Sequence, residues 1–315
     1  MPNWVFNNIG GYTKDIHDKY CTENRDIDFN KEIPEPEEIT NTVCGSFNKI
    51  SKDIVNYKKY VKNIEESNYN SIFYDSNNPL KEPFDNEMTN TIKDMGELAI
   101  ESPDESLNTI LSKDANLCYK REYDTYTSIF GNSRYSRANK GKEVFDKYVE
   151  AKNDRFSNYK LNNSSDDFYN QFDSLEEMGN KLLELKEKYG YDNWYDWRLA
   201  NWGCKWNASD SEYDGEDNIR FDTPWSIPYP VIAKIAEDNP NVKLDGYSEE
   251  ESGWYENYNA ENGKVNVTSS GEYIYDEESD ETQDVLDDNF EPRSFTYSEI
   301  TEEIQRELKL LNIVK

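Results

Sequence analysis

The sequence has very few of the residues that carry most enzyme chemistry. It contains one histidine, His17, so Ser-His or Cys-His catalysis and multi-histidine metal sites would all depend on this single side chain. Its four cysteines, Cys21, Cys44, Cys118 and Cys204, are far apart and include no Cys-x-x-Cys pair. This spacing predicts no structural zinc site and favours reduced thiols in a cytoplasm over a disulfide framework.

Long apolar runs and ligand-binding loops are also absent. No stretch approaches the length of a membrane span, and the N-terminus lacks the basic and then apolar pattern of a signal peptide. There is no glycine-rich phosphate loop followed by Lys-Ser or Lys-Thr, and no calcium loop with its fixed spacing. We therefore expect a cytoplasmic protein with no cofactor, no metal and no membrane partner, and the sequence does not predict catalysis.

Basic residues are scarce relative to acidic ones. The 315 residues include 35 Lys and Arg against 65 Asp and Glu, which gives a formal net charge of -30. Direct binding of nucleic acid needs clustered basic side chains that displace counterions, so a nucleic acid is a poor candidate partner. A basic protein surface is the better candidate, and the alternative is that the acids only keep the protein in solution.

The acidic residues are concentrated in the last third of the chain. Between Asp245 and Glu291 there are 16 acids and one base, Lys264. Such a ratio exceeds the usual variation of a solvated surface. We predict that a partner binds this region, at the residues Glu249, Glu250, Glu251, Asp276, Glu277, Glu278, Asp280, Glu281, Asp284, Asp287 and Asp288.

Aromatic residues are abundant in spite of a mean hydropathy of -1.04. The chain has 7 Trp, 24 Tyr and 13 Phe, which argues for a folded protein because disordered chains are poor in aromatics. The stretch 193–230 holds most of the tryptophans, and large rings so close together are expected to share one core. The predicted core residues are Trp194, Trp197, Trp202, Trp206, Phe221 and Trp225.

Helical and strand patterns alternate in this stretch and after it. Asn193 and Gly203 are typical caps of a helix over 194–202, residues 218–223 alternate in polarity as in a strand, and Ser226 is a candidate cap of a second helix. Further strands are predicted over 242–247, 253–258 and 264–268, with Asn262-Gly263 as a hairpin turn. The fold class is therefore α+β, an antiparallel sheet with helices on one face.

Four segments of the chain resemble one protein family. They are Met1–Trp4, Asp28–Glu38, Asn201–Asn207 and Phe221–Pro228, in the family's order. On these segments the chain resembles the YubB-like family of phage and plasmid proteins, which has a ferredoxin-like domain and no characterised function. The resemblance implies a ferredoxin-like sheet, a mobile-element origin and the cytoplasm of a host cell, and it implies no catalytic residues.

Four regions are predicted along the chain. They are N-terminal strands of the ferredoxin-like domain at 1–42, a mainly helical insert at 43–172, a Trp-rich ferredoxin-like core at 173–268, and an acidic segment with a C-terminal amphipathic helix at 269–315. Capping boxes at Ser174 and Thr296 begin the two clearest helical patterns. The last helix is expected to pack on its own domain, with dimerisation as the alternative.

Two functions from different classes fit these observations. The first is a non-enzymatic phage or mobile-element protein that binds a host protein through an acidic surface, in the manner of a counter-defence inhibitor that imitates nucleic acid. The expected partner is then a host protein that handles nucleic acid or acts in defence. The alternative is a metal-dependent hydrolase or nuclease with carboxylate ligands, since any of the 65 acids could contribute to such a site.

Overall fold

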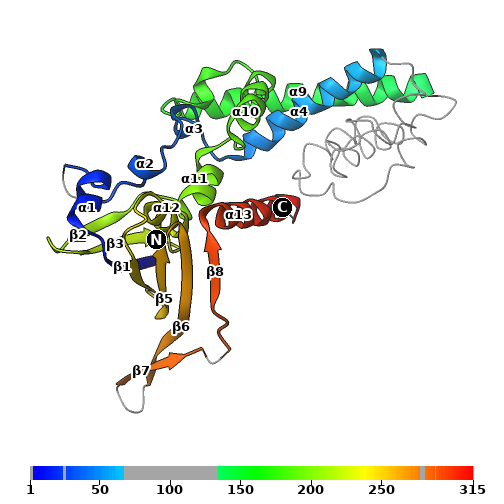
Figure 1. Ribbon diagram of the computed structural model, residues 1–315. Helices are drawn as coiled ribbons and strands as arrows, with labels where there is room; N and C mark the ends of the chain where they lie inside the picture. Colours follow the sequence, from blue (N-terminus) through cyan, green and yellow to red (C-terminus); the bar gives the residue numbers. More distant parts are fainter. Residues whose placement is uncertain (1–2, 24–25, 67–133, 277–280, 288, 315) are drawn as a thin grey trace. The chain divides into compact units, whose positions relative to one another are not determined.

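The computed structural model describes residues 3–23, 26–66, 134–276, 281–287 and 289–314 (Figure 1). The chain divides into two compact units. One combines Met1–Thr42 with Asn193–Lys315, and the other is Val43–Asp192. The middle of the chain is therefore an insertion into a domain that is built from both ends.

The first unit contains one sheet in which every pair of neighbouring strands is antiparallel. The strand order is β2-β3-β1-β4-β5-β6-β7, and β8 also pairs with β6. The strands are β1 (Trp4–Gly10), β2 (Ser209–Tyr213), β3 (Asn218–Pro224), β4 (Leu244–Glu250), β5 (Trp254–Glu261), β6 (Lys264–Asp276), β7 (Glu281–Leu286) and β8 (Arg293–Thr296).

Four of these strands form the ferredoxin-like part that the sequence predicts. β1 lies between β3 and β4, and β2 pairs with the other edge of β3. The helix α11 (Trp194–Trp202) precedes β2 in the connection from β1, and α12 (Tyr229–Asp238) connects β3 to β4. Two β-α-β units are thus interleaved, and the insertion lies within the first of their connections.

The remaining strands extend the sheet beyond β4, which corrects the prediction for 269–315. That region was predicted as an acidic segment before a helix, but β6 continues to Asp276 and pairs there with β7, while β8 pairs with the first part of β6. In Figure 1, β7 lies at the end of β6 that is remote from the helices. Four acidic residues of this region, Glu272, Asp276, Glu281 and Asp284, therefore belong to strands of the sheet, where β-branched and aromatic residues stand among them.

The helices of this unit cover one face of the sheet. α11, α12 and α13 (Tyr297–Val314) pack against one another, and α12 also lies against β5 and β6. The expectation that the last helix packs on its own domain agrees with this arrangement. The covered face buries Val5, Ile9, Ile219, Phe221, Leu244, Tyr258, Val265 and Val267, and each such side chain contributes about 1.5–3 kcal/mol by leaving water.

The start of α12 differs from the prediction that Ser226 caps it. The N-cap is Pro228, and Pro230 occupies the first turn. Proline has no N–H group there, so fewer donors need a cap. The Ser226 hydroxyl instead donates to the carbonyl of Gly203, 2.5 Å away, and so fixes the loop before the helix to the end of α11.

Short helices form the N-terminal segment between β1 and the insertion. They are α1 (Lys14–Tyr20), α2 (Phe29–Glu32) and α3 (Glu37–Thr40). Strands were predicted for 1–42, but after β1 the described residues of this segment form only an isolated bridge between Cys21 and Ile27. Asp28 explains the difference, because its carboxylate caps α2 by accepting from the Asn30 N–H at 3.0 Å.

The second unit is helical in its described residues. It contains α4 (Ser46–Glu66), α9 (Arg134–Asn162), a short 3-10 turn at Tyr169–Gln171 and α10 (Leu175–Tyr189). As predicted, Ser174 caps α10 and Gly190 ends it at a φ of 80°. The predicted boundary at 172 is wrong, however, because α10 belongs with the insertion, which ends at Asp192. Gly179 allows this close packing, since a Cβ there would lie 2.2 Å from the Ser51 carbonyl oxygen of α4.

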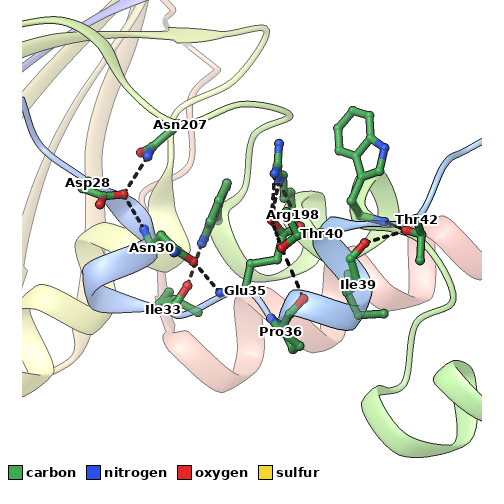
Figure 2. Close-up of polar contacts among 12 residues, drawn as sticks. Asp28, Asn30, Ile33, Glu35, Pro36, Ile39, Thr40, Thr42, Arg198 and Asn207 are labelled. Atoms are coloured by element: carbon green, nitrogen blue, oxygen red, sulfur yellow. Dashed lines mark hydrogen bonds and ion pairs between the residues drawn. The ribbon is translucent and has the colours of Figure 1, made fainter. Parts of the chain in front are cut away.

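The two segments that lead into and out of the insertion meet in the first unit (Figure 2). The Thr42 hydroxyl donates to the Ile39 carbonyl at 2.6 Å and accepts the Trp194 N–H at 2.9 Å. Asn193 caps α11 at the same point, because its side chain accepts from the Asp196 N–H at 2.9 Å. The beginning of α11 is therefore fixed to the residue from which the insertion departs.

Candidate protein-binding surface

The face of the sheet opposite the helices presents polar and aromatic side chains. On β1, Val5, Asn7 and Ile9 are buried beneath the helices, so Phe6 points to the other side. Phe6 is 47% exposed, and α12 packs on the other side of the sheet, where the centroid of its Tyr229 ring lies 5.3 Å from that of Tyr258. We call the Phe6 side the uncovered face.

Two carboxylates flank Phe6 on the uncovered face. Asp222 of β3 and Glu249 of β4 are the direct cross-strand partners of Phe6 on its two sides. Directly opposite side chains in an antiparallel sheet lie about 4.5–5.5 Å apart at Cβ, so the ring lies between two acids. We call these three residues the Phe6 row.

Three tyrosines lie on the same side across β4, β5 and β6; Tyr247 and Tyr273 are half-buried, and Tyr255 between them is buried. The rings of Tyr247 and Tyr255 have centroids 5.7 Å apart, and those of Tyr255 and Tyr273 are 5.0 Å apart. Gly271 makes room for this cluster, because a Cβ there would lie 2.5 Å from the Tyr255 hydroxyl. The result is a continuous aromatic strip beside the Phe6 row.

The tyrosine hydroxyls hold carboxylates at the edge of this strip. Tyr247 donates to Glu249 Oε2 at 2.7 Å, and Tyr255 donates to Asp284 Oδ1 at 2.6 Å. The hydrogen bond to Asp284 raises the pKa of Tyr255 to about 12, so this tyrosine stays protonated and remains a donor at neutral pH. Both acids therefore have fixed orientations before any partner arrives.

Acidic groups also gather around Asp222. Burial raises the pKa of Asp222, and the neighbouring carboxylates of Asp210 and Glu251 raise it further. Like charges oppose the ionisation of one another, so this end of the sheet has an unrelieved negative potential that a cation would relieve.

Trp225 is the most unusual residue at this end of the sheet. It follows β3 directly, its backbone N–H donates to the Asn3 carbonyl at 2.9 Å, and its side chain is 56% exposed. Its φ of 70° lies in the left-handed region, which costs a bulky residue about 1–3 kcal/mol. An exposed indole that is held in such a backbone conformation is better suited to contact a partner than to stabilise the fold.

The predicted partner-binding acids have different positions. Glu249 and Asp284 lie on the uncovered face, as described above. Glu250 and Glu251 are fixed at the end of β1, by hydrogen bonds from the Asn3 side chain and the Trp4 N–H at 3.0 Å each. Asp287 accepts from the Asn289 N–H at 2.9 Å in the loop after β7.

The other predicted acids are described only in part. Asp276 and Glu281 pair with each other in register at the ends of β6 and β7. Glu277, Glu278, Asp280 and Asp288 lie outside the described residues. The structure therefore brings Glu249, Glu250 and Glu251 to one end of the sheet and places Asp284 and Asp287 on or beside β7.

The predicted tryptophan core is correct in part. Trp197, Trp202 and Phe221 are buried, and Trp194 is half-buried. Trp206 and Trp225 are instead 38% and 56% exposed, so the prediction is wrong for these two. Trp206 follows the end of α11, and the Lys205 ammonium lies 4.7 Å from its ring centroid.

The buried part of this core holds an internal ion pair (Figure 2). Arg198 of α11 donates from Nε to both oxygens of Glu35, at 3.0 and 3.1 Å, and from Nη2 to Oε2 at 2.7 Å. Its guanidinium carbon also lies 4.9 Å from the Trp194 ring centroid and 5.0 Å from that of Trp202. Two rings and one carboxylate thus hold one arginine.

Sequence reasoning missed several residues of this surface. Phe6 and the three tyrosines were not singled out, because only the strand register shows that they share a face. Glu256 was counted among the surface acids, but it is buried and bonds to Arg293 and to the Tyr229 hydroxyl. Residues alternate along β5, and this alternation places Glu256 on the helix-covered face of the sheet. That pattern is the signal that could have revealed its burial.

Three side chains that could act as nucleophiles or bases, His17, Cys21 and Cys204, are buried in the fold. His17 is buried with its ring stacked on Tyr213, at a centroid distance of 4.3 Å. Cys21 and Cys204 are buried, and burial raises the pKa of the Cys21 thiol to about 11 and also raises that of Cys204. A thiol with a raised pKa is a poor nucleophile at neutral pH. Within the described ranges, no group of three or more His, Cys, Asp and Glu has an arrangement that could hold a metal.

Comparison with known proteins supports the fold. A family model described as a ferredoxin-like domain in Api92-like protein matches residues 201–289, which run from the end of α11 to just beyond β7. No curated protein and no solved structure matches the chain. In the part of the chain that the structure describes, no helix is both long and apolar enough to cross a membrane.

Proposed function

We propose that this chain is a non-enzymatic binding protein that attaches to a basic surface of another protein through the uncovered face of its sheet. The observation that supports this most strongly is the combination on that face of aromatic rings with oriented carboxylates, namely the Phe6 row, the three tyrosines and Asp284. Exposed aromatic residues are the usual anchors of protein interfaces, and the acids select the charge of the partner.

The net charge of the chain supports the same proposal. A charge of -30 attracts basic partners over distances of about a Debye length and accelerates their encounter. It also repels phosphate backbones, so the exposed aromatic residues of this sheet are poorly suited to nucleic acid. Binding should therefore weaken steeply as the salt concentration rises.

A mobile-element role is the more specific form of this proposal. The four segments that resemble the YubB-like family of phage and plasmid proteins support it, together with the ferredoxin-like family match. In this form the protein acts in the cytoplasm of a host cell as a counter-defence inhibitor. Its carboxylates would occupy a basic groove that normally binds nucleic acid, in a host protein that handles nucleic acid or acts in defence. No observation favours the alternative of a metal-dependent hydrolase.

Affinity capture with matched charge variants tests the proposed function. The tagged protein is incubated with host lysate at low and high salt, and the recovered proteins are identified. A test variant carries Asp222→Asn, Glu249→Gln and Asp284→Asn, and a control variant carries Glu187→Gln, Glu302→Gln and Glu303→Gln. Both variants change the net charge by three, but the control changes only exposed acids on helices.

The expected result is a basic protein that the wild type and the control recover at low salt and the test variant does not. Loss of the same protein at high salt would agree with an electrostatic attachment. Recovery that is equal for the two variants would contradict the uncovered face as the binding surface. Recovery of no basic protein at low salt would contradict the proposed function itself.

A further inference from the structure

The chain contains its own example of how it binds a guanidinium group. At Arg198, one carboxylate accepts three hydrogen bonds and two indole rings lie about 5 Å away on the sides of the group. The rings and the carboxylate bind different parts of the guanidinium group. Its planar face stacks on aromatic rings, and the N–H groups at its edge donate to oxygens.

The Phe6 row combines the same two kinds of group on the surface, with one ring and two carboxylates. An aromatic ring that is 47% exposed lies between the carboxylates of Asp222 and Glu249. No lysine or arginine among the described residues forms an ion pair with either acid. Arg220 is on the same face two residues before Asp222 along β3, where it pairs in register with Asn8 of β1 and Glu212 of β2.

Trp225 adds a second exposed ring at the same end of β1. Its N–H donates to the Asn3 carbonyl, and the Asn3 side chain donates to Glu250 Oε1 at 3.0 Å. The Glu251 carboxylate is fixed next to it by the Trp4 N–H. Asn3 and Phe6 are three residues apart, which is about 10 Å along a strand. The backbone of Trp225 is therefore about 10 Å from that of Phe6 along the sheet.

We propose that Phe6 with Asp222 and Glu249, together with the exposed Trp225 ring and Glu251 at the end of the same strands, forms a binding surface for arginine side chains on an extended segment of a partner protein. This inference rests on the proposed function and specifies the chemistry of its partner. Arginine fits better than lysine because its planar group stacks on an aromatic face while its donors reach acids on both sides. A lysine ammonium is a strongly hydrated point charge and gains less from the rings.

Peptide binding to the full chain tests the proposal. Two labelled peptides of equal length and charge are used, one with four Arg-Ser-Ser repeats and one with four Lys-Ser-Ser repeats, and fluorescence anisotropy gives the affinities at low salt. The variants are Phe6→Thr with Trp225→Asn, which removes the rings, and Asp222→Asn with Glu249→Gln, which removes two acids. The charge control is Glu302→Gln with Glu303→Gln on α13, where both side chains are exposed.

We expect the wild type to bind the arginine peptide about fivefold to tenfold more tightly than the lysine peptide. The ring variant should lose this preference while its affinity for the lysine peptide changes less than about twofold, a pattern that unfolding would not produce. The acid variant should bind both peptides more weakly than the charge control.

Four results would overturn the inference. Equal affinity for the two peptides, or equal effects of the acid variant and the charge control, would show that binding follows net charge alone, and the proposed function would then stand without the arginine surface. Absence of binding to either peptide would count against both. Tighter binding of a labelled single-stranded RNA oligomer than of the arginine peptide would replace the proposed partner with a nucleic acid.

Discussion

Two places in the first unit combine aromatic rings with carboxylates, and they differ in what occupies them. At α11, Trp194 and Trp202 with Glu35 enclose Arg198, a residue of the same chain. At the end of β1, the Phe6 row combines a ring with two acids and involves no basic residue of the described chain. The first arrangement stabilises the fold, while the second leaves its interactions to another molecule.

The difference shows how position determines the role of the same chemical groups. The Glu35 side chain is only 3% exposed, so a cation from the same chain must offset its loss of water. Asp222 and Glu249 remain partly in contact with water, so neither loses the hydration that a partner from the same chain would have to replace. Substitutions at the two places should therefore separate stability from binding.

The largest effect is expected for Trp202→Ala, at the place where two indole rings and Glu35 enclose Arg198. This change removes a buried ring and the hydrogen bond from its Nε1 to the Ile33 carbonyl at 3.0 Å. The free energy of unfolding should fall by about 3–5 kcal/mol, measured by urea denaturation. A fall of less than about 1 kcal/mol would mean that this site does not support the fold.

Glu35→Ala should have the next largest effect, because it leaves the Arg198 guanidinium without its carboxylate. Breaking a buried ion pair costs about 3–5 kcal/mol, and since Arg198 keeps a side-chain exposure of 20% we expect about 2–3 kcal/mol. Thermal unfolding followed by circular dichroism measures this loss. Arg306→Ala, on the exposed side of α13, is the matched control and should change the melting temperature little. Equal effects of the two changes would contradict the structural role of the pair.

Glu32, at the end of α2, is a third type of carboxylate. It is buried, and its Oε1 atom lacks a hydrogen-bond partner among the described atoms. Burial raises its pKa to about 7, compared with a usual value of 4.5. The folded state therefore binds a proton more tightly than the unfolded state does. Its contribution to stability is present below about pH 4.5 and is lost as the pH rises through about 7.

We expect Glu32→Gln to flatten this part of the pH dependence. The variant should be more stable than the wild type at pH 8 by about 1 kcal/mol, after allowance for solvent near the carboxylate, and similar to it at pH 4.5. Urea denaturation at a series of pH values measures both quantities. Identical profiles for the two proteins would show that Glu32 is ionised in the folded state at neutral pH.

In the Phe6 row, Phe6→Thr and Glu249→Gln should each change the free energy of unfolding by only about 0.5 kcal/mol or less, because neither side chain is buried. The same denaturation measurements apply. A loss comparable to that of Trp202→Ala would mean that the Phe6 row is part of the core, and the contrast between the two places would disappear.

The smallest effect concerns the pH dependence of peptide binding. The pKa of Asp222 is raised, so this acid is neutralised earlier than an ordinary aspartate as the pH falls. Affinity for a cationic peptide should then decrease by roughly twofold to fivefold between pH 7 and pH 5, measured by anisotropy. In Asp222→Asn the decrease should be smaller, and an unchanged decrease in that variant would assign the effect to other acids.

Local features of the fold could be predicted from the sequence. The caps at Ser174 and Asn193, the alternation over 218–223 and the turn at Asn262-Gly263 depend on neighbouring residues only, and all of them occur in the structure. The helix that begins after Thr296 is a further example, because the Glu299 carboxylate accepts the Thr296 N–H at 2.8 Å.

The uncovered face could not be predicted, because it depends on which strands become neighbours. Phe6 lies far along the chain from both Asp222 and Glu249, and only the antiparallel register joins them. The exposure of Trp225 follows from a positive φ that is unusual for tryptophan, and tryptophans near one another in sequence suggested a common core instead. Charge counts likewise showed where acids are frequent but not that Glu256 is buried.

The hydrogen bond between Thr42 and Trp194 has a consequence for the insertion. It closes the sheet domain at the point where a separate stretch of polypeptide enters and leaves, so the length of that stretch can vary without moving any strand. Shortening or removing that stretch is therefore expected to leave the sheet domain folded, with Thr42 still bonded to Trp194.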